Sequence, residues 1–465
     1  NEDGKNDSVG IQDVSLYGLL SPILNSVSID KIGIENTRFG YALTQDGYTD
    51  IYTLNQFDFH ANKFLIDSLS VIKKKFWYVD NFLLVGNKIE GQINSNNSNV
   101  SVAHLLLDTE QNLLNISDIQ FKPISVISGQ NYLSGGVKQI NVDGLDYEDG
   151  ISAEQLLIDS VNLSYYNLSK RKTKNTNVEK SGSMDDILDI FSSYSKYLSV
   201  KDIRLKNANL SLFDKRENDT YRLKDLNFYA TEFLFSDSTR QRSKYLFTCE
   251  DVGLSFRDFN NLIPGSGYRL RIDNADISTL SGKMRLDNVK LIPVSDSLPV
   301  IYRVETPLIE ITGFDDDRYL EKGDLKFSDL TIKSPNIQIE DKQKTPRRNT
   351  SNVSSISEIN ALIANKLNIT SGHLLYKSVT KDLSVNIDSL YISSVKWDIS
   401  EGFALGSLIL QSPEVYYIEK QLSIDNNRRD GQSFPSYFGK NIKIERFVIS
   451  EPKFEIEQPN SKLNL

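Results

Sequence analysis

A short phrase recurs along the chain: an apolar residue, four linking positions rich in Ser, Asn, Pro or Gly, and a second apolar residue. It appears as IKSPNIQI from Ile332, LQSPEVYY from Leu410 and ISEPKFEI from Ile449. The flanking residues alternate between apolar and polar, as in half-buried strands, and the linking residues favour turns. Each phrase is therefore predicted to be a strand, a tight reversal and a returning strand. Six further copies are IENTRF (Ile34–Phe39), IDSVNL (Ile158–Leu163), LKNANL (Leu205–Leu210), IDNADI (Ile272–Ile277), ITSGHL (Ile369–Leu374) and ISSVKW (Ile392–Trp397).

A longer repeat of 169 to 171 residues contains the short phrase. Matched blocks in the same order at nearly constant spacing indicate a duplication. The matched blocks are INVDGLDYED from Ile140 and IEITGFDDDR from Ile309, DIQFKPIS from Asp118 and NVKLIPVS from Asn288, FHANKFLIDS from Phe59 and FYATEFLFSD from Phe228, and VSIDKIGIENTRFGY from Val27 and LSVKDIRLKNANLSL from Leu198.

The repeats predict how the chain is organised. We expect a polar N-terminal tail (1–10), β repeat units at 11–180 and 181–352, an abbreviated third unit (353–430) and the start of a truncated fourth (431–465). Charged seams rich in Ser and Asn separate the units. A short helix is expected at the start of each unit, at Tyr17–Ser26, Ser183–Leu198, Ser355–Leu367 and Ser433–Asn441.

These patterns predict a mainly β fold, an elongated, repetitive antiparallel sheet that forms a curved groove or solenoid-like structure. Two arrangements remain open, a closed sandwich in each unit or a continuous curved sheet with a concave apolar face. The scarcity of Gly- and Pro-rich linkers between units favours the continuous sheet. In IKIERFVI (Ile442–Ile449), one extra residue breaks the alternation and predicts a bulge or bend in that strand.

Composition excludes several classes of protein. The hydrophobic content of 39%, with 22 Phe and 22 Tyr, argues against general disorder. A net charge of −9 argues against a nucleic-acid-binding or polybasic membrane surface. Cys249 is the only cysteine, so the chain has neither an intrachain disulfide nor a cysteine metal cluster. No apolar run reaches 18 residues, so no spanning helix is predicted.

The sequence offers no catalytic constellation. His60, His104 and His373 lack metal-ligand spacing, and no nucleophile-elbow, zinc-protease or phosphate-loop motif is present. The acidic stretches Asp143–Gly150 and Phe314–Arg318 suit either Ca²⁺ or solvated turns, and their spacing does not match an EF-hand loop. We therefore expect no catalytic residue, no metal and no cofactor.

The apolar residues that border the phrases are the candidate site. As core they hold the sheet together; as groove lining they would bind acyl chains, with about 0.8 kcal/mol per buried CH₂. The candidate lipid-groove residues are Ile34, Phe39, Leu205, Leu210, Ile332, Ile337, Leu410 and Val415.

The cadence of SVSIDKIGIENTRFGY, FLIDSLSV, LSVNIDSLYISSVKW and IKIERFVISEPKFEI resembles that of AsmA-like proteins, the AsmA/TamB group of the bacterial envelope. The use of Asn, Lys, Ile and Ser is similar to that of a Bacteroidota member. The resemblance implies a periplasmic β-groove, held at the inner membrane by an anchor outside this chain. We expect no anchor helix within these residues and an abbreviated third unit, which are departures from the family pattern.

The resemblance implies a non-enzymatic protein that shields the acyl chains of phospholipid or another lipid, for transport between membranes or outer-membrane maintenance. Envelope membrane proteins are possible partners, and nucleic acid is not expected. An alternative is a structural or scaffold module of an envelope complex or a surface fibre. A third hypothesis, polysaccharide binding or hydrolysis, would need a cleft with two carboxyl groups about 5–10 Å apart.

Overall fold

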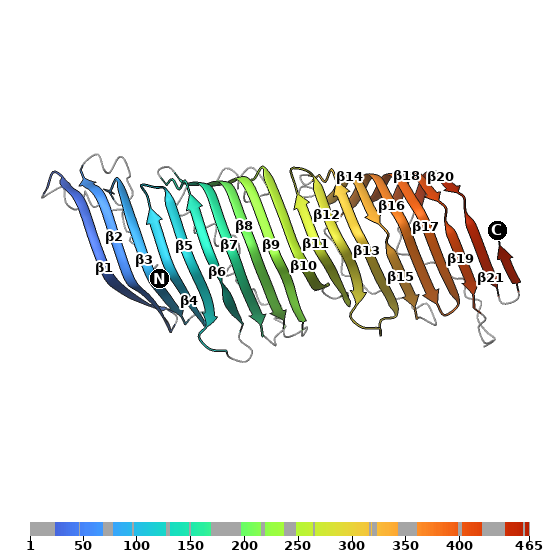
Figure 1. The fold of residues 1–465 in the computed structure, drawn as a ribbon, viewed down its shortest axis with the longest axis horizontal. Coiled ribbons are helices and arrows are strands. Elements are labelled where there is room, and N and C mark those ends of the chain that lie inside the picture. Colours follow the sequence, from blue (N-terminus) through green and yellow to red (C-terminus); the bar gives the residue numbers. More distant parts are fainter. Residues whose placement is uncertain are drawn as a thin grey trace, which may run out of the picture. The chain divides into compact units, whose positions relative to one another are not determined.

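A computed structural model describes residues 24–45, 47–67, 78–94, 97–126, 131–147, 150–168, 197–214, 219–236, 248–263, 266–315, 318, 323–342, 360–398, 402–420, 442–458 and 461–464. Nearly all of these residues lie in strands, and most strand pairs are antiparallel, which confirms the mainly β prediction (Figure 1). The chain divides into two compact units, described separately below. Unit 1 contains residues 1–204 and 232–248, and unit 2 contains residues 205–231 and 249–465.

Unit 1 is a meander in which each strand pairs antiparallel with the next, from β1 to β7. Its strands are β1 (Val27–Gln45), β2 (Tyr48–Ile66), β3 (Asn81–Ile93), β4 (Ser98–Asp108), β5 (Leu113–Pro123), β6 (Tyr132–Asp143) and β7 (Ile151–Asn167). The strands β8 (Tyr197–Asp214) and β9 (Asp219–Ser236) contribute residues to both units.

Unit 2 continues the meander from β9 to β13. It then adds parallel pairs, β14 and β15 with β16, and β18 and β19 with β20 and β21. Its remaining strands are β10 (Asp251–Ile263), β11 (Tyr268–Ser278), β12 (Lys283–Pro293), β13 (Val300–Thr312), β14 (Asp324–Lys333), β15 (Asn336–Asp341), β16 (Ala361–Ser378), β17 (Lys381–Asp398), β18 (Gly402–Gln411), β19 (Glu414–Glu419), β20 (Ile442–Ser450), β21 (Lys453–Gln458) and β22 (Ser461–Asn464).

The short helices expected at the start of each unit are not seen among the described residues. Over Ala361–Leu367 the prediction is wrong, because these residues begin β16, which pairs with β14 and β17 on its two sides. Backbone hydrogen bonds to both neighbouring strands favour the strand conformation, although the apolar residues of this segment have helical spacing. Residues 355–359 lie outside the described residues. Ser433–Asn441 and most of Tyr17–Ser26 and Ser183–Leu198 lie outside the described residues.

The duplication is visible in the backbone. The strands β4 and β11 are each 11 residues long, as are β5 and β12, and each pair begins 170 positions apart. Non-glycine residues with positive φ also repeat at spacings of 169 to 171. They are Asn36 and Asn207, Lys63 and Glu232, Lys88 and Asp258, and Asp118 and Asn288. The repetitive architecture is therefore present in the fold, while the exact unit boundaries remain a prediction.

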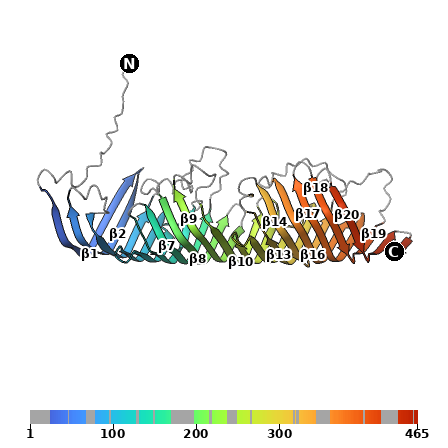
Figure 2. The same ribbon diagram turned by 90° about the horizontal axis from the view of Figure 1, so that it is seen from above.

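The recurring phrases are not reversals, and this prediction is wrong. The phrases IENTRF, IDSVNL and ITSGHL each lie inside one continuous strand, which Asn36, Ser160 or Ser371 interrupts with a positive φ of 49° to 55°. A left-handed residue within a paired strand changes the direction of that strand without ending it. The phrase therefore marks a bend, and in Figure 2 the strands of each unit curve and do not lie flat.

The proline-containing phrases also mark bends and not reversals. In IKSPNIQI, β14 and β15 both pair with β13, in one register on either side of Ser334 and Pro335. Ladder bonds flank the break, since the Ser334 N–H donates to Thr370 O (2.7 Å) and the His373 N–H donates to Pro335 O (2.8 Å). Proline has no N–H to donate, so it fits where the ladder is already interrupted.

The bends of neighbouring strands lie side by side. On β10 and β11 the pairs Arg257–Asn274 and Phe259–Ile272 flank Asp258, so Asp258 lies opposite Asp273 without a shift in register. The bends of the following strands, through β21, are aligned in the same way, because each pair of strands keeps one register on both sides of its bend. In unit 2 we call the strand halves that include β14, β18 and β20 arm 1, and those that include β15, β19 and β21 arm 2.

Candidate functional site

Apolar side chains meet on one side of the bend. Phe256 and Phe259 lie on either side of Asp258 in β10, and their ring centroids are 5.6 Å apart. They pack against Ile272, Ala275 and Val289, which are all at least nine-tenths buried. Side chains from the two arms can converge only on the inner side of a bend, so the apolar face is the inner face.

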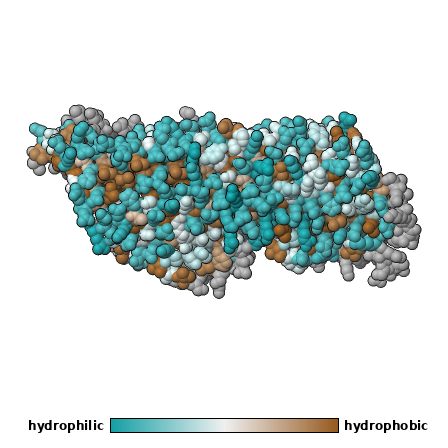
Figure 3. Space-filling view, in the orientation of Figure 1, coloured by the Kyte–Doolittle hydropathy of each residue, from teal (hydrophilic) through white to brown (hydrophobic). Residues whose placement is uncertain are grey.

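Polar side chains occupy the outer side of the bend. Asp258, Asn288, Ser334 and Ser371 are exposed there. The Lys224 ammonium lies 2.6 Å from Asp258 Oδ2, and this hydrogen bond, with the attraction between the charges, lowers the pKa of Asp258. Figure 3 shows one side of the molecule that is largely hydrophilic over the strands of unit 2, as expected for this outer face. Each bend thus separates a solvated ridge from an apolar interior.

In unit 2 the inner face consists of lateral rows, because paired residues on neighbouring strands point to the same side. Rows A and B lie on arm 1 and row C lies on arm 2. Row A is Phe256, Ala275, Leu286, Ile309, Ile332, Ile369, Leu390, Leu410 and Ile449. Row B is Leu254, Ile277, Met284, Ile311, Leu330, Leu367, Ile392, Leu408 and Phe447. Row C is Leu270, Leu291, Val304, Ile337, Leu374, Val385, Val415 and Phe454.

Unit 1 has equivalent apolar rows on both sides of its bend. One row is Ile34, Phe59, Leu84, Leu107, Leu114, Val142 and Leu156, and the other is Phe39, Leu54, Ile89, Val102, Ile119, Val137 and Val161. Phe39 makes an edge-to-face contact with Phe57 across the bend, with ring centroids 5.0 Å apart. The same cross-bend packing therefore identifies the inner face of this unit.

The structure places six of the eight predicted groove residues in these rows. Ile34 and Phe39 lie on β1, Ile332 and Leu410 in row A, and Ile337 and Val415 in row C. Leu205 and Leu210 lie on β8 on either side of Asn207, whose positive φ marks the bend of that strand. The residues that sequence reasoning missed are those between the phrases, such as Met284 and Leu367, because no single strand reveals which lateral neighbours complete a row.

The inner face is half-buried. Phe39 is 47% exposed and Phe447 is 57% exposed, whereas Pro413, at the bend, is less than 2% exposed. Most row residues lie between these extremes. Among the described residues, the strands pair laterally and no second layer of strands packs on the rows. The inner face is therefore sealed at Pro413 in the bend, while row residues such as Phe39 and Phe447 are accessible.

Two of the three histidines and the second acidic stretch have structural partners. His104 Nδ1 lies 2.8 Å from Asn87 Oδ1, and His373 Nδ1 lies 2.6 Å from Asn386 Oδ1. In the second acidic stretch, Lys326 Nζ lies 2.9 Å from Asp315 Oδ2 and pairs with that carboxylate. Within the described part of the chain, no group of three or more His, Cys, Asp or Glu side chains is arranged to hold a metal ion.

The described residues contain no helix that is both long and apolar enough to cross a membrane.

The candidate site is a face and not a pocket of convergent polar groups: it consists of long apolar rows, a sealed bend and a polar exterior. Comparisons with protein-family models, curated proteins and solved structures found no match for this chain.

Proposed function

We propose that this chain is a non-enzymatic protein whose inner face shields lipid acyl chains, for transport between membranes or for outer-membrane maintenance. The observation that carries the proposal is the lateral continuity of rows A and B. Each runs across nine strands without a polar residue. At a strand spacing of about 4.8 Å, eight intervals correspond to about 38 Å of uninterrupted apolar surface.

The width of the face also suits an acyl chain. On arm 1 the apolar inner residues of β14 extend from Leu325 to Ile332, seven steps of about 3.3 Å, or about 23 Å. One leaflet of a bilayer core is about 15 Å thick. An acyl chain that lies on this arm would lose most of its contact with water, which stabilises it by about 0.8 kcal/mol per buried CH₂.

The resemblance to AsmA-like proteins stays a hypothesis, and with it the periplasmic location, the anchor outside this chain and the envelope partners. A scaffold role is the second candidate, because among the described residues β1 pairs on one side only, with β2. An exposed strand edge accepts a strand from another protein. A scaffold of this kind would need no lipid on the inner face.

Native mass spectrometry of the purified chain, with lipid extraction of the same sample, tests the proposal. We expect co-purifying two-chain lipids that extraction removes and that added vesicles restore. If the protein stays free of lipid after incubation with vesicles, while its circular dichroism shows an intact β fold, the proposal is wrong. Strand addition to β1 would then be the function to examine.

A further inference from the structure

The first strand of unit 1 has one edge without a partner strand, and the equivalent edges elsewhere in the chain are covered. Among the described residues β1 pairs on one side only, with β2, and we call its other side the open edge. The repeat of 171 positions matches β1 with β8 and aligns their left-handed residues, Asn36 and Asn207. The strands β16 and β20–β21 follow long connections, as β8 does, and bend at the left-handed residues Ser371 and Glu451. We call β1, β8, β16 and β20–β21 the opening strands.

Each of the other opening strands has a parallel neighbour, which is the strand before it in the chain. β16 pairs with β14 and β15, and β20–β21 pair with β18 and β19. On β8, Lys201 Nζ lies 2.6 Å from Glu154 Oε1 of β7. The Tyr197 ring lies against Gly150 at the same spacing of 47 positions, so β7 and β8 also run in one direction. We call β7, β14–β15 and β18–β19 the closing strands, and the open edge of β1 is the place where such a strand is missing among the described residues.

The missing neighbour is visible in the exposure of one isoleucine. Ile34, Ile369 and Ile449 each lie two positions before the left-handed residue of their opening strand. Ile369 has a paired strand on both sides and is half-buried. Ile34 and Ile449 each have one paired strand among the described residues, and each is 38% exposed. A strand on the open edge would therefore cover Ile34 as β14 covers Ile369.

A lysine on β1 occupies a position that forms an ion pair with a closing strand elsewhere. Lys31 lies five positions before the left-handed residue of β1, as Lys366 does in β16. Lys366 Nζ lies 4.0 Å from Asp329 Oδ1 of β14, its lateral partner. Lys31 is exposed and forms no ion pair within the described part of the chain. It is thus placed to pair with a carboxylate on an incoming strand.

An arginine on β1 repeats this relation on the other side of the bend. Arg38 lies two positions after the left-handed residue of β1, as Lys453 does in β20–β21. Lys453 Nζ lies 2.8 Å from Glu414 Oε1 of β19, its lateral partner. Arg38 is also exposed, and among the residues that the structure describes it has no carboxylate partner. The open edge therefore presents one cation on each side of its bend.

A backbone hydrogen bond at the bend also recurs. The Ser412 N–H of a closing strand donates at 2.9 Å to Ser450 O, directly before the left-handed residue of the opening strand, and the same bond joins β14–β15 to β16. On β1 the equivalent acceptor is the Glu35 carbonyl. It accepts one hydrogen bond from Thr37 Oγ1 at 3.1 Å, and a carbonyl oxygen has a second lone pair for an incoming N–H.

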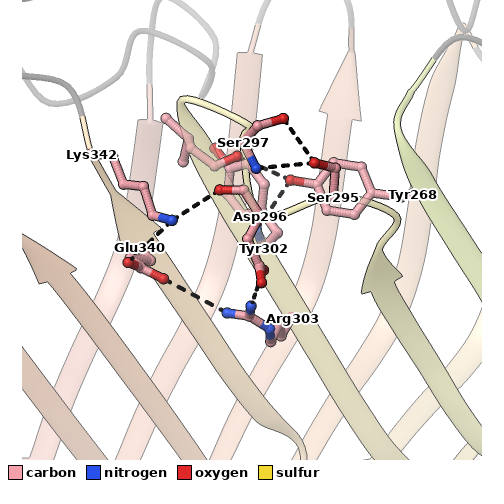
Figure 4. Close-up of polar contacts among 9 residues, drawn as sticks. Tyr268, Ser295, Asp296, Ser297, Tyr302, Arg303, Glu340 and Lys342 are labelled. Atoms are coloured by element: carbon pink, nitrogen blue, oxygen red, sulfur yellow. Dashed lines mark hydrogen bonds and ion pairs between the residues drawn. The ribbon is translucent and has the colours of Figure 1, made fainter.

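A closing strand is also held along its other edge (Figure 4). Arg303 of β13 lies 3.8 Å from Glu340 of β15, and Lys342 Nζ, directly after β15, donates to Asp296 O at 2.9 Å. These contacts join β15 to its antiparallel neighbour β13 and leave its opposite edge for β16. A protein that supplies a closing strand to β1 can therefore keep that strand in its own sheet and offer only the outer edge.

A second copy of this chain does not supply the required strand. Two β1 edges related by a twofold axis run antiparallel when their inner faces lie on the same side, whereas closing strands run parallel to opening strands. The three closing strands of a second copy are already paired with their own opening strands. An occupant of the open edge therefore has to come from a different protein.

We infer that the open edge of β1 binds a closing strand from another protein, parallel to β1, with the bends of the two strands side by side. The closing strands define its chemistry: alternating apolar residues, a left-handed Ser at the centre (Ser160, Ser334 or Ser412), and a carboxylate five positions before that Ser or two positions after it. This inference names the partner for the scaffold role, and it holds whether or not the inner face binds lipid.

The orientation is tested with a synthetic peptide of residues 324–341, the closing strand β14–β15. Bimane is attached to the full chain, in a Cys249→Ser background, at Ser28→Cys near the start of β1 or at Thr44→Cys near its end. The two sites are 16 residues apart, so a nitroxide at the peptide N-terminus should quench Ser28→Cys about threefold more than Thr44→Cys, and a C-terminal nitroxide should reverse this order. Equal quenching, the opposite order or no quenching at both sites overturns the inference.

The register is tested by an exchange of charges. Lys31→Glu places a carboxylate beside Asp329 of the peptide and should weaken binding about fivefold, and a peptide with Asp329→Lys should restore it. Lys122→Glu, at an exposed residue of β5, makes the same change in net charge and should leave binding unchanged. Equal losses in the two variants, or no restoration by the exchanged peptide, overturn the register.

Two measurements on the same samples separate this inference from the other hypotheses. Native mass spectrometry reports bound lipid, and its absence overturns the proposed lipid function while peptide binding at β1 still supports the partner strand. Analytical ultracentrifugation reports self-association. A monomer that binds the peptide supports a different protein as the partner, and a dimer that excludes the peptide overturns that assignment.

Discussion

A single carboxylate placed in the middle of row B should block the inner face locally. Ile392 lies between Leu367 on β16 and Leu408 on β18, and it packs on the buried cluster of Phe327, Ala364 and Val395. In Ile392→Asp, an acyl chain that crosses this point must contact a carboxylate in apolar surroundings, at a cost of about 3 kcal/mol. That free energy corresponds to about a hundredfold loss of local lipid affinity.

The assay uses bimane at Leu408→Cys, the lateral neighbour of Ile392, and a titration with a lipid that carries an acyl-chain nitroxide. The concentration of lipid at half-maximal quenching should rise about a hundredfold in Ile392→Asp. Tyr391→Asp is the matched control, since Tyr391 precedes Ile392 in β17 and points to the outer face, beside Asn368 and Ile409. It should change the midpoint less than twofold. Equal effects of the two substitutions, with both proteins folded by circular dichroism, would refute the assignment of the inner face.

Three further predictions concern the bend. Ile272→Ala should lower the free energy of unfolding by about 3 kcal/mol, because Ile272 is buried at the bend. Leu270→Ala, two positions out along arm 2, should lower it by about 1 kcal/mol, because Leu270 is only partly buried. Urea titrations that give equal losses for the two variants would contradict this packing. Ser412 has a φ of 45°, so Ser412→Val should be less stable than Ser412→Gly by about 1–2 kcal/mol in the same assay, and the reverse order would argue against the bend. The hydrogen bond from Lys224 lowers the pKa of Asp258, so its contribution to stability is present above the unfolded pKa of about 3.9 and is lost as the pH falls through the folded value. The urea midpoint should therefore fall more between pH 7 and pH 3 in the wild type than in Lys224→Met, and identical falls would show that the pair contributes nothing.

Periodicity predicted the strands and the duplication but misassigned the links between strand halves. Ser and Asn with flanking apolar residues favour both hairpin turns and left-handed residues within a strand. The deciding signal is the spacing of the apolar residues across the link. Strict strand alternation places inner residues two apart, but Phe256 and Phe259 are three apart across the bend. The same three-residue step occurs in Ile442–Ile449, which lies within the single strand β20, and the bulge or bend predicted there stays a prediction.

The inner face was only partly predictable. Bordering residues such as Ile332 were identified because each copy of the phrase begins and ends with an apolar residue. Rows, however, depend on lateral partners that lie far apart in sequence, such as Ile309 and Ile332 or Leu410 and Ile449. The parallel pairing of β14 with β16 also joins segments across a long connection that local patterns do not specify.

The constant register across the bends from β10 to β21 has a consequence for how such a chain changes in evolution. A block of whole strands can be inserted or removed without moving the bend of any remaining strand, because each bend is defined within its own strand and aligned by its neighbours. Loss of one residue between Ser371 and the end of β16, in contrast, would turn the following side chains to the other face. The number of strands therefore sets how far the apolar rows run, and the position of the bend within each strand sets how wide each arm is. These two dimensions can vary independently, so copying a block of strands lengthens the inner face and keeps its width.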